Sequence, residues 1–478
     1  MVSVTQEITR RAVLMPVLCI GMLVIGVDAT IVNIALPSIQ ADLGISEDGL
    51  VWIVNAYLLT FSGLMLVVGR LGDLIGNRRL FLLGVALFTA ASVVCGFSRI
   101  PAFLIGARAV QGTGGAVVSV MALSLLLRLF EEGPARTKAL GIVAFTNVLG
   151  GTCASLLGGF ITSELDWRWI FFVNVPVGTS VYVLAQAYLP RENAISPKLN
   201  IDAAGAVAAT ASLMFALCAA QAGPNAGSQV SHAVIFVAIS VALAAIFLRI
   251  EALSRVPLVP TTVLRYRNLW VATVVETAAS AAVYIWGFMS TLYLQRVLRY
   301  TALDVALAIL PSSFLAAVLP LGAANKWVGR WGNRIPVVTG LLLSAVALML
   351  LARRGAHGSY LADVLPASLL LGIGIGIVPI PLTVMAMADV LPTDSGVASG
   401  LINTASMMGA ALGLAAASGI AAVRTRGLEG IEDPTSALSD GYQLALLGGA
   451  LLMAIGALVS LTFFRSRAAL QRDDWPHP

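Results

Sequence analysis

The sequence predicts an all-α integral membrane protein with 14 transmembrane helices, arranged as two six-helix bundles and a two-helix insertion. Hydrophobic residues make up 58% of the 478 residues and charged residues only 11%, less than half of the roughly 25% charge of a soluble domain. This length holds about fourteen spans of some 21 residues joined by short connections. A turn of Gly and Arg follows two different apolar runs, which indicates duplicated halves.

Apolar runs of spanning length recur along the whole chain. The first six cover about 13–36, 50–68, 80–97, 103–127, 139–162 and 170–189. Two more, at about 203–221 and 232–250, contain almost no polar residues, and the last six cover about 269–293, 304–324, 336–351, 360–388, 395–423 and 442–464. Pro37 is expected to end the first helix. The predicted divisions are an N-terminal bundle (1–190), a cytoplasmic link with the inserted helices (191–254), a C-terminal bundle (255–464) and a cytoplasmic tail (465–478).

The distribution of basic residues predicts how the chain lies in the membrane. About 20 of the 29 Lys and Arg residues fall in the loops of one side and about 8 in those of the other. Because basic loops stay in the cytoplasm, we expect a multi-pass protein of the inner (plasma) membrane with both termini cytoplasmic. The basic residues form no continuous stripe, so nucleic acid is not expected as a partner.

Several other functions lack their motifs. The four cysteines lie inside apolar runs without paired spacing, and the three histidines fall in loops or the tail. No metal and no cofactor are therefore expected, which disfavours a membrane-embedded enzyme. The chain also has no Gly-rich ATP-binding loop, which disfavours a primary pump.

Three charged residues inside predicted spans are the candidate functional groups, because a charge at the bilayer centre costs about 2.5 to 3.5 kcal/mol or more. Asp28 lies about 12 Å from the outer end of its helix and Arg108 about 8 Å from the outer end of the fourth. At these similar depths the two side chains are able to interact across an aqueous cavity. Glu276 lies about 10 Å from the cytoplasmic end of its helix. We predict that all three serve proton coupling, the alternative being structural ion pairs that lock helices together.

The turn at 69–79 resembles the loop signature between helices 2 and 3 of the major facilitator superfamily. The positions that fit are Gly69, Leu71, Gly72, Asp73, Gly76, Arg78 and Arg79. Leu74 and Asn77 replace basic residues of the family pattern, and Gly332-Asn333-Arg334 repeats Gly76-Asn77-Arg78. The resemblance implies a conformational latch built from Gly69, Asp73, Gly76, Arg78 and Arg79.

Two further runs resemble signatures of the fourteen-helix drug/proton antiporters, the multidrug exporters of this superfamily. The run 28–37 is similar to their helix 1 signature, and Arg108–Ala116 is similar to the helix 4 signature, in which the family assigns the Arg to proton coupling. In the fifth helix Ala154-Ser155 replaces the Gly-Pro of the antiporter signature. The missing proline makes antiport a weaker inference than transport itself.

Residues of the last helices and several aromatic side chains give predictions about the substrate and its cavity. The run 396–404 is similar to a late signature of the same branch, but Ser406-Met407 replaces its Arg-Gln, so a different substrate choice is expected. The run 166–178 also resembles this branch, although an interfacial aromatic belt explains it better. Six polar or large side chains are predicted to line the substrate cavity, namely Asn33, Tyr57, Gln111, Trp286, Asn403 and Met407. An interfacial belt explains Trp286 equally well.

Taken together, these features predict a secondary active transporter that exports amphipathic drug-like or antibiotic compounds by alternating access, in exchange for protons. Its expected partners are a small-molecule amphipathic substrate, protons and the lipid bilayer, and we expect a monomer. A dedicated exporter of a single natural product is the nearest alternative. A membrane-embedded enzyme is the alternative from a different class.

Overall fold

The computed structural model describes residues 4–130, 134–190, 203–222, 230–253, 265–321, 327–328, 330–353, 359–391, 395–428, 431 and 433–464, and every regular element in these ranges is a helix. The first nine helices are α1 (Val4–Leu43), α2 (Glu47–Ile75), α3 (Asn77–Gly96), α4 (Pro101–Leu129), α5 (Pro134–Glu164), α6 (Trp169–Phe172), α7 (Asn174–Tyr188), α8 (Ala203–Ala222) and α9 (Val230–Leu253). The remaining elements are α10 (Arg267–Leu292), η2 (Tyr293–Val297), α11 (Ala302–Val318), η3 (Leu319–Leu321), α13 (Arg334–Ala352), η4 (Tyr360–Val364), α14 (Leu365–Ile377), α15 (Pro379–Ala386), α16 (Ser395–Leu428) and α17 (Pro434–Phe463).

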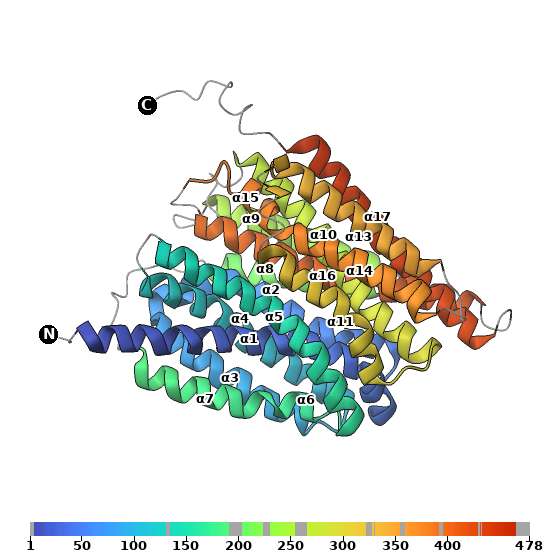
Figure 1. Cartoon of the computed structure of the whole chain (residues 1–478), viewed down its shortest axis with the longest axis horizontal. Coiled ribbons are helices and arrows are strands. Elements are labelled where there is room, and N and C mark those ends of the chain that lie inside the picture. Colours follow the sequence, from blue (N-terminus) through green and yellow to red (C-terminus); the bar gives the residue numbers. More distant parts are fainter. Residues whose placement is uncertain are drawn as a thin grey trace.

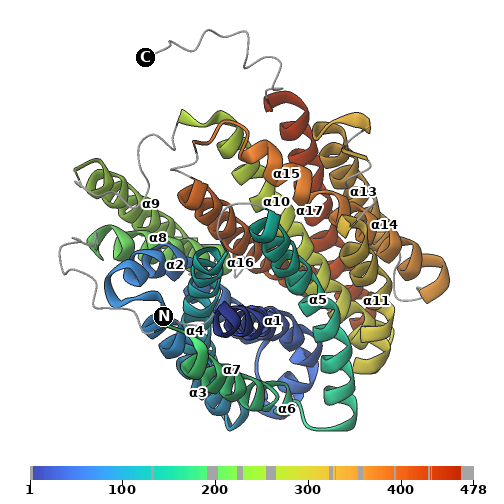
Figure 2. The same cartoon turned by 60° about the vertical axis from the view of Figure 1, so that its left-hand side comes forward.

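The helices pack as two groups. In the N-terminal group, α1 contacts α4, α5 and α7, while α4 packs between α2 and α3. In the C-terminal group, α10 packs on α16 and α17, and α13 on α14 and α17. Figure 1 shows the N-terminal group in blue and green below the C-terminal group in yellow and red, and Figure 2 shows the same two groups after rotation.

The helices α8 and α9 lie outside this division. They pack on each other, with Ser212 and Ser240 each donating its hydroxyl hydrogen to the other residue's backbone carbonyl. The helix α8 contacts both α2 and α16, and Thr210 donates a hydrogen bond of 2.8 Å to the carbonyl of Gly63 in α2. The predicted insertion therefore touches both groups through its first helix.

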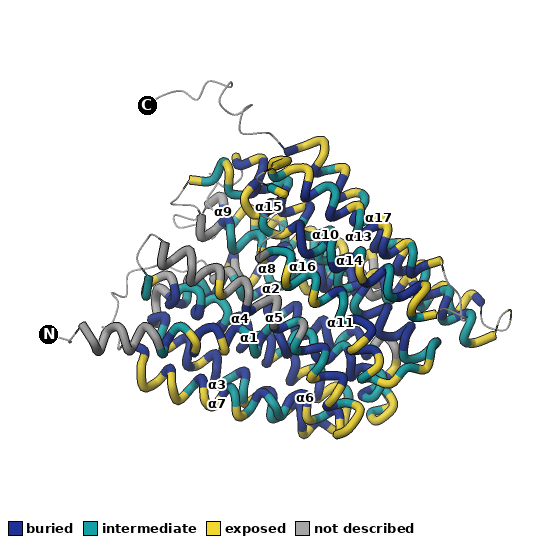
Figure 3. Tube along the Cα trace, viewed as in Figure 1, coloured by how far each residue is buried: buried dark blue, intermediate teal, exposed yellow. Residues whose placement is uncertain are grey.

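The described helices have the character of membrane spans. Ten of them, within the described ranges, are long and apolar enough to cross a bilayer, and three shorter apolar helices accompany them. Buried residues gather along the surfaces between helices, whereas exposed residues lie toward the periphery (Figure 3). Many of the exposed side chains are large and apolar, as lipid contact requires.

The predicted end of the first helix was wrong. Helix α1 passes through Pro37 and ends at Leu43. A proline removes one backbone hydrogen bond, but a membrane penalises an unwound segment more, because nothing in the hydrocarbon replaces its lost bonds. The span predicted at 360–388 is present as Tyr360–Ala386, and within it the chain is divided into η4, α14 and α15. The division after α14 falls before Pro379, the first residue of α15, because proline donates no hydrogen bond and its ring clashes with the preceding turn.

The two groups are joined at the end of the molecule that carries Leu43 of α1 and the turn η2, which we call the closed end. There Gln295 Nε2 donates a hydrogen bond of 3.0 Å to the carbonyl of Ile34 in α1. The next residue, Arg296, donates to Gln40 of α1. The wider five-residue π-turn of η2 presents both side chains to the N-terminal group, and such turns occur often at functional positions.

A second contact at the closed end joins α5 to α11. The backbone N–H of Leu303 donates a hydrogen bond of 3.0 Å to the hydroxyl of Ser163. One turn away, a Cβ added to Gly159 would lie 2.5 Å from the Cβ of Ala306. Only a residue without a side chain permits this approach, which is how small residues bring membrane helices together.

Candidate functional site

The carboxylate of Asp28 lies fully buried in the centre of the N-terminal group. Arg108 Nη1 donates to its Oδ2 at 2.6 Å, so the two side chains form an ion pair. Its Oδ1 accepts hydrogen bonds from Gln111 Nε2 at 2.8 Å and Asn174 Nδ2 at 2.7 Å. All three partners are donors, and an ionised carboxylate can only accept hydrogen bonds.

The guanidinium of Arg108 is also fully buried and held from several sides. Its Nε donates to the carbonyl of Ile53 in α2 at 3.2 Å, and its Nη1 donates to Gln111 Oε1 at 2.7 Å as well as to Asp28. The ring of Tyr57 lies 4.3 Å from the guanidinium carbon, within the range of a cation–π contact. Asp28 and Arg108 thus meet directly, whereas the sequence suggested an interaction across an aqueous cavity.

A layer of polar groups supports this pair. Gln111 Nε2 donates to the hydroxyl of Ser92 in α3 at 2.8 Å, and Ser92 donates to the carbonyl of Phe88 at 2.9 Å. The cluster therefore joins α1, α2, α3, α4 and α7. Buried polar networks are costly unless their members are satisfied, and in this cluster Arg108 Nη2 has no hydrogen-bond partner among the described residues.

The sequence did not single out Asn174 and Ser92. Asn174 belongs to the run 166–178, and its interpretation as part of an interfacial belt is wrong for this residue, which is buried against Asp28. That interpretation fits Arg168, which bonds Asp42 and Asp166 at the surface. The signal available in the sequence was an amide in an otherwise apolar stretch at the start of a helix.

Glu276 lies in α10 of the C-terminal group and is half-buried. Its Oε1 accepts a hydrogen bond of 3.1 Å from the hydroxyl of Ser280, one turn along the helix. The Ser280 and Ser406 hydroxyl oxygens are 2.6 Å apart, so the chain of contacts extends to α16. Ser406 is the residue that replaces the arginine of the family signature, and here it helps to position an acid.

The residues predicted for the substrate cavity fall in different environments. Tyr57 and Gln111 belong to the buried cluster around Asp28, and Trp286 is buried in α10. Met407 is half-buried against apolar neighbours, and Asn403 is exposed. Asn33 is half-exposed, with its Oδ1 buried and unbonded among the described residues.

The predicted latch lies at the turn between α2 and α3. Gly76 has φ of 94°, a conformation that favours glycine, and it ends α2. Arg78 donates to the carbonyls of Leu189 at 3.1 Å and Gln186 at 2.9 Å, at the C-terminus of α7, where a cation is stabilised. Gly69 lies within α2 and Arg79 is exposed. The Asp73 side chain falls outside the described set, as does Gly329 of the second turn.

In the described part of the chain, no cluster of three or more His, Cys, Asp or Glu side chains is placed to hold a metal ion. Asp28 accepts hydrogen bonds from nitrogen donors, whereas Glu276 accepts one from the Ser280 hydroxyl.

Comparisons with known proteins agree with this architecture. The chain is 34% identical over 416 residues to the cephamycin export protein CmcT of Amycolatopsis lactamdurans, covering 86% of this chain and 85% of that protein. It is 33% identical over 404 residues to the puromycin resistance protein pur8 of Streptomyces alboniger, covering 84% of this chain and 79% of that protein. A bacterial homolog of the human lysosomal transporter Spinster, solved in an inward-facing and occupied conformation, shares the fold with a TM-score of 0.67 at 16% identity, covering 98% of this chain and 99% of that one.

A family model connects these similarities with the sequence signatures. It is described as the Major Facilitator Superfamily and matches residues 18–414, which span both helix groups. With this match, the two relatives above and the helix packing, the chain belongs to the Major Facilitator Superfamily.

Proposed function

We propose that the protein is a secondary transporter that exports amphipathic, drug-like or antibiotic compounds across the inner membrane in exchange for protons. Relatives named for cephamycin export and puromycin resistance support the direction and the substrate class. Two six-helix bundles and the insertion α8–α9, with 14 spans in all, would form the transporter. We propose a monomer as the working unit.

The observation that carries proton coupling is the buried Asp28–Arg108 pair. A charge pair shielded from water is retained at a considerable cost, and both side chains of this pair are fully buried. Protonation of Asp28 would remove the charge that holds Arg108, leaving the guanidinium to find other acceptors. Because the cluster joins five helices of the N-terminal group, that change would shift the relative stability of the two access states.

The closed end shows which side of the membrane the protein must open to release its substrate. With both termini in the cytoplasm, as the basic residues predict, the closed end is the outer face. The contacts of Gln295 and Arg296 with α1 then seal the outer side. Opening for release would break these hydrogen bonds, and proton entry to Asp28 would drive the return.

We assign Glu276 to the same cycle. Its half-buried carboxylate, held by Ser280, would pair with a cationic substrate or carry a second proton. Asn33, Trp286, Asn403 and Met407 remain our candidates for contacts to the apolar body of the substrate, with Tyr57 and Gln111 acting through the Asp28 cluster.

The turn between α2 and α3 is proposed as a latch at the cytoplasmic side. The contacts of Arg78 with the end of α7 support an anchoring role for this arginine. Asp73 is our candidate for the group that changes its partner between the two access states. We assign the close turn to Gly69 and Gly76, and an exposed positive charge to Arg79.

Everted membrane vesicles test the proposal. An imposed proton gradient, acidic inside, should drive uptake of ethidium, and internal pH should rise as ethidium enters. Vesicles without the protein are the control. Ethidium uptake at the same rate with and without the proton gradient would exclude antiport. The proposal of transport itself would still hold.

A dedicated exporter of one natural product is the second candidate, supported by the 34% identity to a cephamycin exporter. The replacement Ser406-Met407 in the late signature agrees with an altered substrate choice. A panel of structurally unrelated amphiphiles separates the two functions, since a dedicated exporter would transport a single chemical type.

A further inference from the structure

The buried acid Asp28 has three hydrogen-bond partners, and all of them donate to it. They are Arg108, Gln111 and Asn174. An ionised carboxylate accepts from all three, but a protonated carboxyl carries a hydrogen of its own, which needs an acceptor. Proton exchange at Asp28 therefore requires a partner that donates in one state and accepts in the other.

Arg108 and Gln111 are unable to change in this way. A guanidinium only donates hydrogen bonds. The Gln111 amide is engaged at both ends, since its Nε2 donates to Asp28 and to Ser92 at 2.8 Å each. Its Oε1 accepts from Arg108 at 2.7 Å. If this amide turned over, its NH2 group would face the donor of Arg108, and the hydrogen bond between them would be lost.

Asn174 is the remaining partner, and its amide is engaged at one end only. Its Nδ2 donates to Asp28 Oδ1 at 2.7 Å and lies 3.5 Å from the hydroxyl oxygen of Ser92, whereas its Oδ1 makes no hydrogen bond within the described residues. The terminal torsion of an asparagine side chain has broad, roughly two-fold preferences. A half-turn therefore exchanges the nitrogen and the oxygen, and the oxygen then faces Asp28 as an acceptor.

The backbone that carries Asn174 is held in place by its neighbours. Arg168, before the start of α7, donates to Asp42 of α1 at 2.8 Å. Gly178 lies one turn after Asn174 on the same face of α7, and a Cβ at this position would overlap the hydroxyl of Thr89 in α3. Close packing thus keeps the amide at the acid, and the rotation of its own side chain is the freedom that it retains.

The other titratable groups of the cluster keep their charge near neutral pH. The described side chains that interact electrostatically with Asp28 are Arg108 of α4, Tyr57 of α2 and Cys95 of α3, and Tyr284 of α10 interacts with Arg108. Arginine, tyrosine and cysteine do not ordinarily change their protonation state between about pH 5 and 7. Among these groups, Asp28 is therefore the one that binds a proton in this range.

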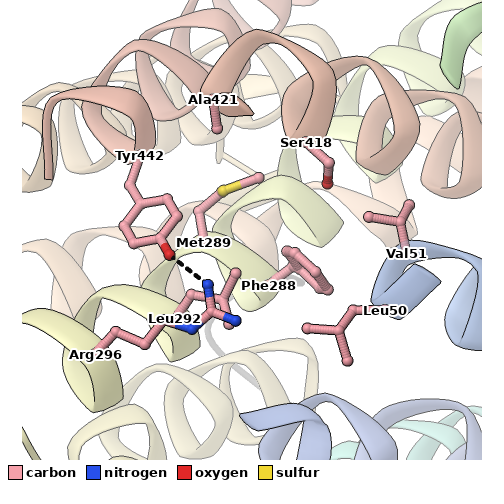
Figure 4. A pocket seen from close by; sticks show the side chains of 9 residues that line it. All are labelled: Leu50, Val51, Phe288, Met289, Leu292, Arg296, Ser418, Ala421 and Tyr442. Carbon is pink, nitrogen blue, oxygen red and sulfur yellow. Dashed lines mark hydrogen bonds between the residues drawn. The ribbon is translucent and has the colours of Figure 1, made fainter. Parts of the chain in front are cut away.

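Helix α1 connects this acid with the closed end. Beyond Asp28 it carries Gln40, which accepts a hydrogen bond from Arg296. Arg296 also donates to the Tyr442 hydroxyl at 3.0 Å, beside a small cavity between α2 and the C-terminal group whose lining includes Leu50 (Figure 4). The partners of Asp28 and the contacts that close the outer side therefore act on one helix.

We propose that Asn174 permits Asp28 to bind a proton, by turning its amide from a donor into an acceptor. A proton delivered from water forms an O–H bond on Asp28 Oδ1, the charge of the site rises by one, and the new hydrogen is donated to Asn174 Oδ1. When the proton leaves, the amide turns back. This inference rests on the proton exchange proposed above and makes Asn174 its positioning residue.

Transport kinetics in everted vesicles with an acidic lumen test this role. Asn174→Leu removes the donor and the acceptor at similar size. It should lower the maximal rate of ethidium uptake about tenfold, equivalent to roughly 1.4 kcal/mol, with the KM for ethidium unchanged. A tenfold higher proton concentration in the lumen should recover most of the loss, because the ionised acid keeps Arg108 and Gln111 whereas the protonated acid has no acceptor. Asn174→Ser, whose hydroxyl both donates and accepts, should lose about threefold.

Infrared difference spectra of the purified full-length protein, recorded on acidification, give a readout that does not depend on transport. The carboxyl band that is missing in Asp28→Asn belongs to Asp28. In Asn174→Leu this band should move to higher frequency, because a hydrogen-bonded carboxyl absorbs at lower frequency than a free one. Asn174→Ser should show a smaller shift, and it carries the test if Asn174→Leu does not fold.

Ser180→Ala is the matched control, since Ser180 is exposed on the same helix and donates to the carbonyl of Pro176. Both readouts should be unchanged in this variant. A rate loss in Asn174→Leu that more protons do not relieve, a raised KM, or an absent or unshifted Asp28 band would overturn the proposal. Proton-driven uptake by the unaltered protein is measured in parallel, so a failed transport function is recognised separately while the infrared band still tests Asn174.

Discussion

Arg108 Nη1 lies 2.6 Å from Oδ2 of Asp28, and neither side chain has any exposed surface. Such a pair is stable only while both members are present, because removal of one leaves an uncompensated buried charge. It joins α1 to α4 at the centre of the N-terminal group. The pair is therefore the first place to test both the proton coupling and the stability of the fold.

Asp28→Asn should abolish proton-driven export while the protein still inserts, at a lower free energy of unfolding because Arg108 is left without its counter-charge. The amide keeps the shape of the carboxylate, but it does not change between a charged and a neutral form by taking up a proton. Ethidium uptake into everted vesicles under a proton gradient is the measurement, and Asp42→Asn, which changes an exposed acid paired with Arg168, is the control. Undiminished uptake against a gradient would remove Asp28 from the coupling mechanism.

Arg108→Leu should lower the free energy of unfolding by about 3–5 kcal/mol, because Asp28 would then lie buried without its cation. Adding Asp28→Asn to this variant should restore part of the loss, since the uncompensated charge disappears. Denaturant titration in detergent, followed by tryptophan fluorescence, measures both effects.

The control for this prediction is Arg424→Leu. That arginine forms a partly exposed pair with Asp440 at 3.3 Å, and such pairs contribute about 0–1 kcal/mol. A loss at Arg108 no larger than the loss at Arg424 would contradict a central structural role for the buried pair.

Glu276→Gln should reduce the export of cationic substrates and leave neutral ones nearly unchanged, since the half-buried carboxylate is the acid available for a cation in α10. Ser406→Ala should produce a smaller shift in the same direction, because it removes one contact from the chain that positions Glu276. Efflux of ethidium and of chloramphenicol is compared in cells. Glu164→Gln, at the exposed end of α5, is the control, and equal losses for both substrates would exclude a role in substrate charge.

Arg296→Ala should open the closed end more often, because Gln40 and Tyr442 both lose a hydrogen bond. Leu50→Cys in a cysteine-free background reports the opening, since Leu50 lines the cavity and is almost fully buried. A membrane-impermeant maleimide should label it about tenfold faster, equivalent to roughly 1.4 kcal/mol.

The control for this opening is Arg168→Ala. Arg168 also lies at the closed end, but its partners Asp42 and Asp166 belong to the N-terminal group. Labelling that rises equally in both variants would show that Arg296 does not hold the two groups together.

Depth within the helices showed that Asp28 and Arg108 lie at similar levels, so that an interaction across an aqueous cavity was possible, because the rise of an α-helix is constant and both residues are measured from the same membrane face. Asn174 was not predicted in the same way. Its contact with Asp28 depends on how α7 packs against α1 and α3, which no spacing in one helix reveals.

The sequence alone determined the class of protein, since composition, the length of the apolar runs and the placement of basic residues follow from the bilayer as a solvent. It also determined which charges lie inside the spans. Only the tertiary structure decided that Asp28 and Arg108 touch, that Ser406 helps to position Glu276, and that Arg296 spans the two groups. These contacts join helices distant in the chain, and their geometry depends on close packing of small residues such as Gly159 rather than on any local pattern.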